Sequence, residues 1–223
     1  MKYKTCVSIA EKTPNKIKQI LKIALKKSDY VEVRFDFLKI EHVPQTLELI
    51  KKDLNKVVCT LRPKTEGGKF TGNEKERIAI LKLIAEYNPF LLDVEFNTLN
   101  KNEALRKYLK STKAELLVSW HDFKKTPNSS ELKKKLNQMS KFSSNVKIVS
   151  TAISINDSNR VLELYSKKGK NNLIAFAMGD LGRISRILCL YLGSPYTYVS
   201  LGKPIAPGQF SVDEVKKITN LKK

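Results

Sequence analysis

The stretch YVEVRFDFL at residues 30–38 is one of eight short runs of apolar and β-branched residues in this 223-residue chain. The runs lie at 5–10, 30–38, 56–62, 90–96, 115–120, 146–154, 173–179 and 196–201, so successive runs start 23 to 34 residues apart. Segments with the apolar spacing of a helix lie between several of them, for example at 17–27, 75–87, 103–111 and 158–168. A strand followed by a helix, repeated at this interval, is the pattern of parallel βα units. Eight such units in this length predict the α/β class and a (β/α)8 TIM barrel.

The composition is that of a folded protein without a membrane segment. Hydrophobic residues make up 41% of the chain and no Pro- or Gly-rich linker divides it, so we expect one domain over residues 1–223 that ends in a helix at 213–223. The apolar run from Cys6 to Ala10 is too short for a signal peptide, and no run is long enough to cross a membrane. Three widely separated cysteines predict buried, reduced thiols in a cytoplasmic protein.

The formal net charge is +20, from 42 Lys and Arg against 22 Asp and Glu. Such a charge first suggests a nucleic acid or an anionic membrane as the partner. However, 35 of the 42 basic residues are lysines dispersed over the helical segments, and no sequence pattern of a nucleic-acid-binding fold occurs. We therefore expect an anionic small molecule as the partner, with neither nucleic acid nor membrane, and keep nucleic-acid binding as a competing hypothesis.

Charged residues inside the apolar runs indicate where a site lies. Strands of a parallel barrel are buried on both faces and are normally apolar throughout. In VEVRFDF, alternation places Glu32, Arg34 and Asp36 on one face. Other strands carry similar exceptions, namely Ser8, Arg62, Asp93 with Glu95, Ser119 with His121, and Lys147. A structural ion pair explains any one of them. A polar active site at the carboxyl ends of the strands explains the whole set better, because buried charges are costly unless they are paired.

Lys147 interrupts an apolar strand, so burial and neighbouring arginines are expected to lower the pKa of its amine. A neutral amine attacks a ketone and forms a Schiff base. His121 directly follows the fifth run and is a candidate base for the proton that an imine acidifies. Lysine and histidine on neighbouring strands therefore predict carbonyl chemistry through an imine, either dehydration or aldol cleavage. With only two histidines and no clustered cysteines, we expect no metal site.

Seven segments, in order along the chain, point to a family. They are EVRFDF at 32–37, TLRPKTEGGKF at 60–70, DVEF at 93–96, SWHDFKKTP at 119–127, MGDLGRISR at 178–186, GSPYTY at 193–198 and APGQ at 206–209. Together they closely resemble the type I 3-dehydroquinate dehydratases, from the first strand to the last loop. The resemblance implies a barrel that converts 3-dehydroquinate to 3-dehydroshikimate and water in the shikimate pathway of aromatic amino acid biosynthesis, with no metal or organic cofactor. Another imine-forming barrel enzyme, such as a class I aldolase, is the alternative.

The resemblance also implies roles for nine residues. Lys147 matches the Schiff-base lysine, His121 the general acid and base, and Glu66 a residue that orients His121. The substrate-binding set matches Ser8, Glu32, Arg34, Arg62, Arg186 and Gln209. Among these, Arg186 is expected to hold the substrate carboxylate, since a guanidinium binds a carboxylate through two hydrogen bonds.

Two features depart from the family pattern. In the family the position before APGQ often holds a small hydroxyl residue that contacts substrate, and here it is Ile205, whose side chain supplies no hydrogen bond, so a backbone contact is the alternative at this position. The chain begins almost at its first strand, as in a short form without the N-terminal extension that covers the lower end of the barrel in longer relatives. We expect either the segment Met1 to Thr5 or helices and side chains to close that end. By analogy with relatives, a homodimer is expected.

Overall fold

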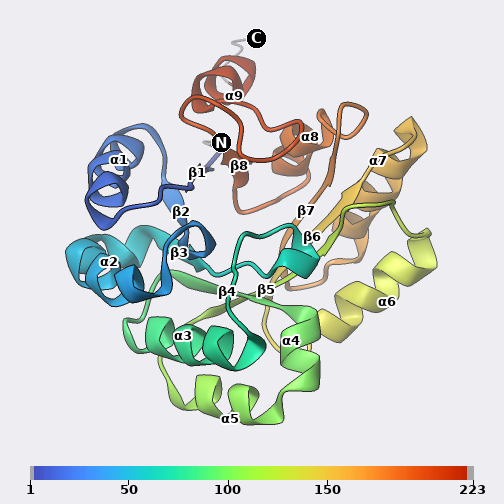
Figure 1. Ribbon diagram of the computed structural model, residues 1–223. Helices are drawn as coiled ribbons and strands as arrows, with labels where there is room; N and C mark the ends of the chain where they lie inside the picture. Colours follow the sequence, from blue (N-terminus) through green and yellow to red (C-terminus); the bar gives the residue numbers. More distant parts are fainter. Residues whose placement is uncertain (1–2, 220–223) are drawn as a thin grey trace.

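The computed structural model describes residues 3–219, with the strands at the centre and the helices around them (Figure 1). The strands are β1 (Thr5–Ile9), β2 (Tyr30–Arg34), β3 (Val57–Thr60), β4 (Leu91–Glu95), β5 (Leu116–Asp122), β6 (Asn145–Thr151), β7 (Asn172–Met178) and β8 (Thr197–Val199). The α-helices are α1 (Pro14–Lys27), α2 (Val43–Ile50), α3 (Glu74–Glu86), α4 (Phe96–Lys101), α5 (Glu103–Ser111), α6 (Ser129–Met139), α7 (Ile155–Leu162), α8 (Ser185–Tyr191) and α9 (Val212–Thr219). Each of the eight predicted runs overlaps one strand. Residues 220–223 of the predicted last helix lie outside the described residues.

The strands form one parallel sheet in the order β7-β6-β5-β4-β3-β2-β1-β8. Within residues 3–219, no hydrogen-bonded ladder joins β7 to β8, so the barrel is near-closed. Side chains of these two strands, including Phe176 and Tyr198, belong to the same buried cluster. The eight parallel strands and their surrounding helices confirm the predicted TIM-barrel fold of the α/β class.

The helices pack their apolar faces on the barrel. Ile17 and Leu21 of α1 are buried at helical spacing, while most lysines of the same helix are exposed. Helix α3 begins with a capping box, in which the Asn73 side chain accepts the Glu76 N–H and the Glu76 carboxylate accepts the Asn73 N–H. This cap defines the start of α3, and it places Arg77 one turn into the helix, over the end of β4.

Strand β2 is shorter than the sequence pattern predicts. It ends at Arg34, and Phe35–Phe37 forms a 3-10 turn. The prediction that Asp36 shares the strand face of Glu32 and Arg34 is therefore wrong, because alternation holds only while the chain stays extended. The turn instead brings the Asp36 carboxylate against the Arg34 guanidinium, with two hydrogen bonds of 2.7 Å.

Aromatic rings cover the core at the lower end of the barrel, where the strands begin. The ring of Tyr30 stacks on that of Phe90 with centroids 4.3 Å apart, and it lies 5.4 Å from the ring of Tyr196. Side chains are thus one of the two closures that we expected. The other was the segment Met1 to Thr5, of which Lys4 lies over the Tyr30 ring and donates to its hydroxyl at 3.3 Å, while residues 1 and 2 lie outside the described residues.

Cys6, Cys59 and Cys189 are buried and unbridged, as predicted. Among the helices within residues 3–219, none combines the length and the apolar character needed to cross a membrane.

Candidate active site

All nine residues that the sequence singled out line one cavity. It has a volume of about 110 Å³ and lies at the carboxyl ends of the strands, where barrel enzymes have their active sites. The nine are Ser8, Glu32, Arg34, Arg62, Glu66, His121, Lys147, Arg186 and Gln209. Residues from the first strand to the last loop therefore meet at one place.

Lys147 lies within β6 with a buried amine. Its Nζ is 3.3 Å from Asp93 Oδ2, 3.6 Å from Glu32 Oε1 and 4.1 Å from the centroid of the Tyr198 ring. Although burial raises the pKa of Asp93, Arg62 and Lys147 bring it below its usual value, so this carboxyl is ionised. Burial and arginines around the amine could be expected from the sequence, and the structure adds two carboxylates, Asp93 and Glu32, that attract a cation to this position.

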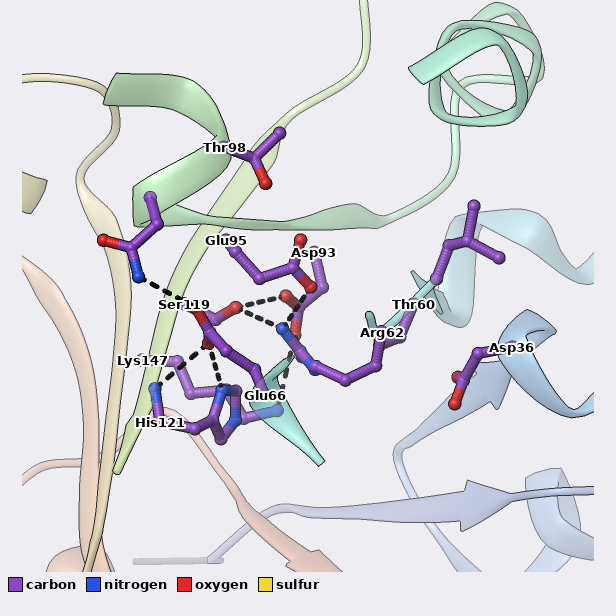
Figure 2. Close-up of polar contacts among 12 residues, drawn as sticks. Asp36, Thr60, Arg62, Glu66, Asp93, Glu95, Thr98, Ser119, His121 and Lys147 are labelled. Atoms are coloured by element: carbon purple, nitrogen blue, oxygen red, sulfur yellow. Dashed lines mark hydrogen bonds and ion pairs between the residues drawn. The ribbon is translucent and has the colours of Figure 1, made fainter. Parts of the chain in front are cut away.

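His121 and Glu66 form a hydrogen-bonded pair beside this amine (Figure 2). His121 Nδ1 lies 3.0 Å from Glu66 Oε2, and the same oxygen accepts the backbone N–H of His121 at 3.2 Å. Glu66 ends a 3-10 turn, and Gly67 follows it with φ +75°. A side chain at position 67 would be strained in this left-handed conformation and would meet the Phe123 ring, so the turn that presents Glu66 to His121 depends on glycine.

The charge state of this pair follows from its burial. Burial lowers the pKa of His121 well below its usual value, and nearby Arg62 and Lys147 act in the same direction. Burial also raises the pKa of Glu66 to about 7, although Arg62 opposes the shift. Near neutral pH, His121 is thus an uncharged imidazole. When it donates the Nδ1 hydrogen to ionised Glu66, Nε2 is left as a proton acceptor.

Arg62 is held by three partners in the barrel interior (Figure 2). Its Nη1 donates to Glu95 Oε1 and to Ser119 Oγ, both at 2.6 Å, and its Nη2 donates to Asp93 Oδ2 at 2.5 Å. Burial opposes the charge, but Asp93 and Glu95 raise the pKa of Arg62 above its usual value. The guanidinium is therefore a fixed cation, and its Nε hydrogen and one Nη2 hydrogen remain for a bound molecule.

Arg186, in contrast, is a buried cation without a carboxylate partner among residues 3–219. Its side chain, on α8, is 2% exposed. Its Nη2 donates to the Pro207 carbonyl at 3.0 Å, its Nε has no partner among the described residues, and the guanidinium lies over the Phe176 ring. Burial lowers the pKa of Arg186 to about 10. An unpaired buried charge is unfavourable, so this position is suited to an anionic group from a bound molecule.

The other predicted residues are held by nearby groups. Glu32 accepts a hydrogen bond of 2.9 Å from Thr60, and Arg34 is bound by Asp36 as described above. Gln209 accepts the backbone N–H of Ile205 at 2.9 Å, which leaves its amide hydrogens uncommitted. Ile205 lines the cavity with its apolar side chain, and Ser8 lines it from β1.

The cavity also has members that the sequence analysis did not single out. Tyr198, Phe176, Met178, Val149 and Phe123 contribute apolar surface to its wall. Val149 and Phe176 carry no signal in the sequence, because apolar residues on a strand are expected in any core. Phe123, Met178 and Tyr198 lie in the segments that carry the family resemblance, and those segments were the one signal that could have identified them. Asp93 and Ser119 are polar exceptions within their own strands. Their contacts with Lys147 and Arg62 join different strands, so no single segment of the sequence predicts these contacts.

Comparisons with known proteins identify relatives of this chain. Residues 5–223 match the family described as type I 3-dehydroquinase. The 3-dehydroquinate dehydratase of Dehalococcoides mccartyi is 36% identical over 201 residues, which cover 87% of this chain and 88% of that protein. The 3-dehydroquinate dehydratase of Pyrococcus abyssi is 37% identical over 203 residues, which cover 91% of each chain.

Solved structures agree with this relationship. The 3-dehydroquinate dehydratase of Geobacillus kaustophilus has the same fold, with a TM-score of 0.87 over 100% of this chain and 93% of that one, at 24% identity. The enzyme of the same name from Aquifex aeolicus gives a TM-score of 0.79 at 27% identity, over 98% of this chain and 99% of that one. Because the family match spans nearly the whole sequence and curated relatives exceed 30% identity over most of it, the chain belongs to the type I 3-dehydroquinase family.

Proposed function

We propose that this member of the type I 3-dehydroquinase family is a hydro-lyase that converts 3-dehydroquinate to 3-dehydroshikimate and water through an imine at Lys147. The observation that carries the proposal is that one cavity is lined by the Lys147 amine, the Glu66–His121 pair and the guanidinium of Arg186, which has no carboxylate partner among residues 3–219. These groups supply a nucleophile, a base and a carboxylate-binding cation, which are what an imine-based dehydration of a keto acid requires. The scheme uses no metal or organic cofactor.

Formation of the imine is the first chemical step. The substrate carboxylate binds Arg186, and the ketone carbon lies next to Lys147 Nζ. The amine gives up a proton, for which Asp93 and Glu32 are the nearest carboxylates, and attacks this carbon. The ketone oxygen takes up two protons and leaves as water, so an ammonium and a ketone become a protonated imine and water.

Elimination follows from the electron demand of the protonated imine. His121 Nε2 accepts a proton from the neighbouring carbon, and an enamine forms. His121 then returns this proton to the hydroxyl on the next carbon, which leaves as water while the conjugated imine forms. Hydrolysis of that imine releases the product and restores Lys147. The remaining polar side chains of the cavity bind substrate hydroxyls in this scheme: Ser8, Glu32, Arg34, Arg62 and Gln209.

The loop at 202–210 covers the bound ring in this scheme. It contributes Ile205, Ala206, Pro207 and Gln209 to the lining of the cavity. Closure of such a loop excludes bulk water, which would otherwise hydrolyse the imine before elimination.

A direct assay tests the function. Conversion of 3-dehydroquinate by the purified protein is expected to give a conjugated enone, which ultraviolet absorbance follows, and no carbon–carbon bond breaks. A class I aldolase would instead release two shorter carbonyl compounds, which mass spectrometry distinguishes from the enone. Purified protein that forms no enone would contradict the proposal.

We expect Glu66→Gln to remove the acid limb of the pH–rate profile. Below about pH 7 wild-type Glu66 gains a proton, its hydroxyl donates to Nδ1, and the imidazole hydrogen moves to Nε2, where it blocks proton abstraction. Wild-type kcat/KM is therefore expected to fall about tenfold per pH unit below this pKa. The glutamine oxygen accepts the Nδ1 hydrogen at every pH, so the variant is slower at pH 8 but its kcat/KM changes little down to pH 6.

Steady-state rates between pH 5.5 and pH 8.5 measure this difference. Glu41→Gln, at an exposed surface position, is the control and is expected to keep the wild-type profile. An acid limb at the same pH in Glu66→Gln would show that another group controls it.

A cytoplasmic homodimer is also part of this proposal, and the outer face of α8 is the contact surface that we favour. Free, buried thiols fit a reducing compartment. Exposed apolar side chains lie on or next to α8, namely Leu181, Ile184, Leu188, Tyr191 and Leu192. No lysine occurs between Lys170 and Lys203, in a chain whose net charge is +20. Two copies repel each other over most of their surfaces, so this apolar face, which has Asp180 and Arg183 at its edge but no lysine, is where they can meet.

The double variant I184K/L188K is therefore expected to be monomeric, since it places like charges in the contact. Light scattering during size-exclusion chromatography measures the mass in solution. Ile23→Lys, at an exposed apolar position of α1, is the matched control and is expected to remain dimeric. A monomeric wild type or a dimeric double variant would refute this contact.

A further inference from the structure

Arg77 is a buried arginine that the reaction scheme above does not use. It lies on α3, and its side chain is 1% exposed. On its inner side, Nη1 donates to Glu95 Oε2 at 2.6 Å. On its outer side, Nε and Nη2 donate to the two carboxylate oxygens of Glu74, each at 2.8 Å, and Nη2 also donates to Thr98. Arg77 therefore connects helix α3 to the end of β4.

Glu95 joins Arg77 to the active-site cavity. Its second oxygen, Oε1, accepts a hydrogen bond of 2.6 Å from Arg62, so one buried carboxylate holds two buried arginines. Arg62 in turn donates to Asp93, whose carboxylate lies 3.3 Å from Lys147 Nζ. Charges of alternating sign thus form an unbroken chain of contacts from α3 to the reacting amine: Arg77, Glu95, Arg62, Asp93 and Lys147. Figure 2 shows the inner part of this chain, from Glu95 to Lys147.

The charge of Glu95 depends on both arginines. Burial raises the pKa of Glu95 above its usual value, and Asp93 adds to the rise, while Arg62 and Arg77 lower it. Without Arg77, the one arginine left in contact with Glu95 would be Arg62, which Glu95 shares with Asp93, and uptake of a proton by Glu95 would then relieve the cost of its buried charge. The other titratable groups near Glu95 line a cavity on the outer side of the same strand end: Glu66, Glu74, Lys101 and His121.

Protonation of Glu95 would change the position of Arg62. The guanidinium of Arg62 is held between Glu95 and Asp93, with Ser119 as a third partner. When Glu95 becomes neutral, Asp93 is the remaining carboxylate that Arg62 contacts directly. Arg62 and Lys147 already contact the same oxygen of Asp93, and without an ionised Glu95 no second charge holds the Arg62 guanidinium in its place in the cavity wall.

We propose that Arg77 is a positioning residue for the dehydration: by sharing Glu95 with Arg62, it keeps that carboxylate ionised and holds Arg62 in the cavity wall beside Asp93 and Lys147. The inference rests on the proposed function, because its readout is the dehydration rate. Arg77 is not among the residues that line the Lys147 cavity, so it acts through Arg62 rather than on the substrate.

The test compares the pH dependence of kcat/KM in Arg77→Met with that of the wild type. We expect the loss to be largest at the acid end of the pH range, about 10- to 100-fold, because removal of Arg77 raises the pKa of Glu95 further and favours its neutral form. The loss is expected to shrink as the pH rises, because Glu95 ionises again and pairs with Arg62. Arg77→Lys keeps the charge, so its loss is expected to stay below about tenfold at every pH, with no new ionisation. Both proteins are compared in a Glu66→Gln background, because the charge of Glu95 raises the pKa of Glu66 and a change at Glu95 would otherwise shift that ionisation too.

Glu95→Gln gives an independent measurement, because it makes the neutral state permanent. It is expected to show the low-pH loss of Arg77→Met at all pH values, and R77M/E95Q is expected to be no slower than Glu95→Gln alone. Arg106→Met is the control for the loss of packing that any arginine-to-methionine change causes. Arg106 is a partly buried arginine of α5 that donates to backbone carbonyls.

A purely structural role for Arg77 predicts a different result. The ratio of Arg77→Met to wild type would then be the same at every pH, and that outcome would overturn the inference. Arg77→Lys that is no better than Arg77→Met would overturn it as well. A wild type that does not dehydrate 3-dehydroquinate would overturn the proposed function itself, and the inference with it.

Discussion

Replacement of Lys147 by methionine is expected to lower kcat by about 10⁴-fold or more, because the nucleophile that forms the imine is lost. In the wild type, borohydride added during turnover reduces the imine and attaches the substrate-derived skeleton to Lys147. Peptide mass spectrometry is expected to find this added mass on Lys147 of the wild type and on no residue of Lys147→Met. The enone assay on the same samples gives the loss of rate.

Lys147→Arg separates loss of the nucleophile from loss of the charge. Its guanidinium keeps a cation between Asp93 and Glu32 but forms no imine with a ketone. We expect it to be as inactive as Lys147→Met yet more stable, because the methionine variant leaves two buried carboxylates without their shared cation. An arginine variant with normal turnover, or borohydride mass on another lysine, would refute the imine at Lys147.

Replacement of Arg186 by methionine is expected to lower kcat/KM by about 100- to 1000-fold while making the free protein more stable. The rate falls, mainly through KM, because the substrate carboxylate loses its partner. The stability rises, by about 1–3 kcal/mol, because a buried cation without a carboxylate among residues 3–219 is replaced by an apolar side chain of similar length. Steady-state kinetics and denaturant unfolding measure the two effects.

Arg34→Met is the matched control for the change in stability. Arg34 is paired with Asp36, whose side chain is buried, so its removal leaves a carboxylate unpaired. The two arginine variants are therefore expected to change the free energy of unfolding in opposite directions. A destabilised Arg186→Met with an unchanged KM would mean that Arg186 has a structural partner and does not bind the carboxylate.

The barrel could be predicted because parallel strands buried on both faces leave a visible trace in the sequence. The run at 173–179 is apolar over its whole length, the run at 146–154 is interrupted by Lys147, and helical segments separate many of the runs. The prediction was wrong where the chain stops being extended. Asp36 follows the alternation of β2 in the sequence, yet the 3-10 turn at Phe35–Phe37 moves it off that face. Contacts such as the one between Asp36 and Arg34 set a turn of this kind. The alternation of residues along a strand does not predict such contacts.

The members of the site could also be predicted. Lys147 and His121 interrupt or follow strands that are otherwise apolar, and the loop motifs extended the list to Glu66, Arg186 and Gln209. All nine line one cavity because the carboxyl ends of parallel strands meet at one end of a barrel. Roles for these residues remain proposals that the variants above test.

The sequence by itself determined which residues meet in this protein, and only the tertiary structure decided how their charges pair. Lys147 and Arg186 are both basic residues of the predicted site, but Lys147 lies beside Asp93 and Glu32 while Arg186 contacts a carbonyl and an aromatic ring. Arg77 has the sequence context of any helical arginine, yet it completes a buried chain of charges that ends at Lys147. The energy of a buried charge depends on distances of a few ångströms between side chains on different strands and helices. Those distances follow from strand register and helix packing, which no periodicity within one segment contains.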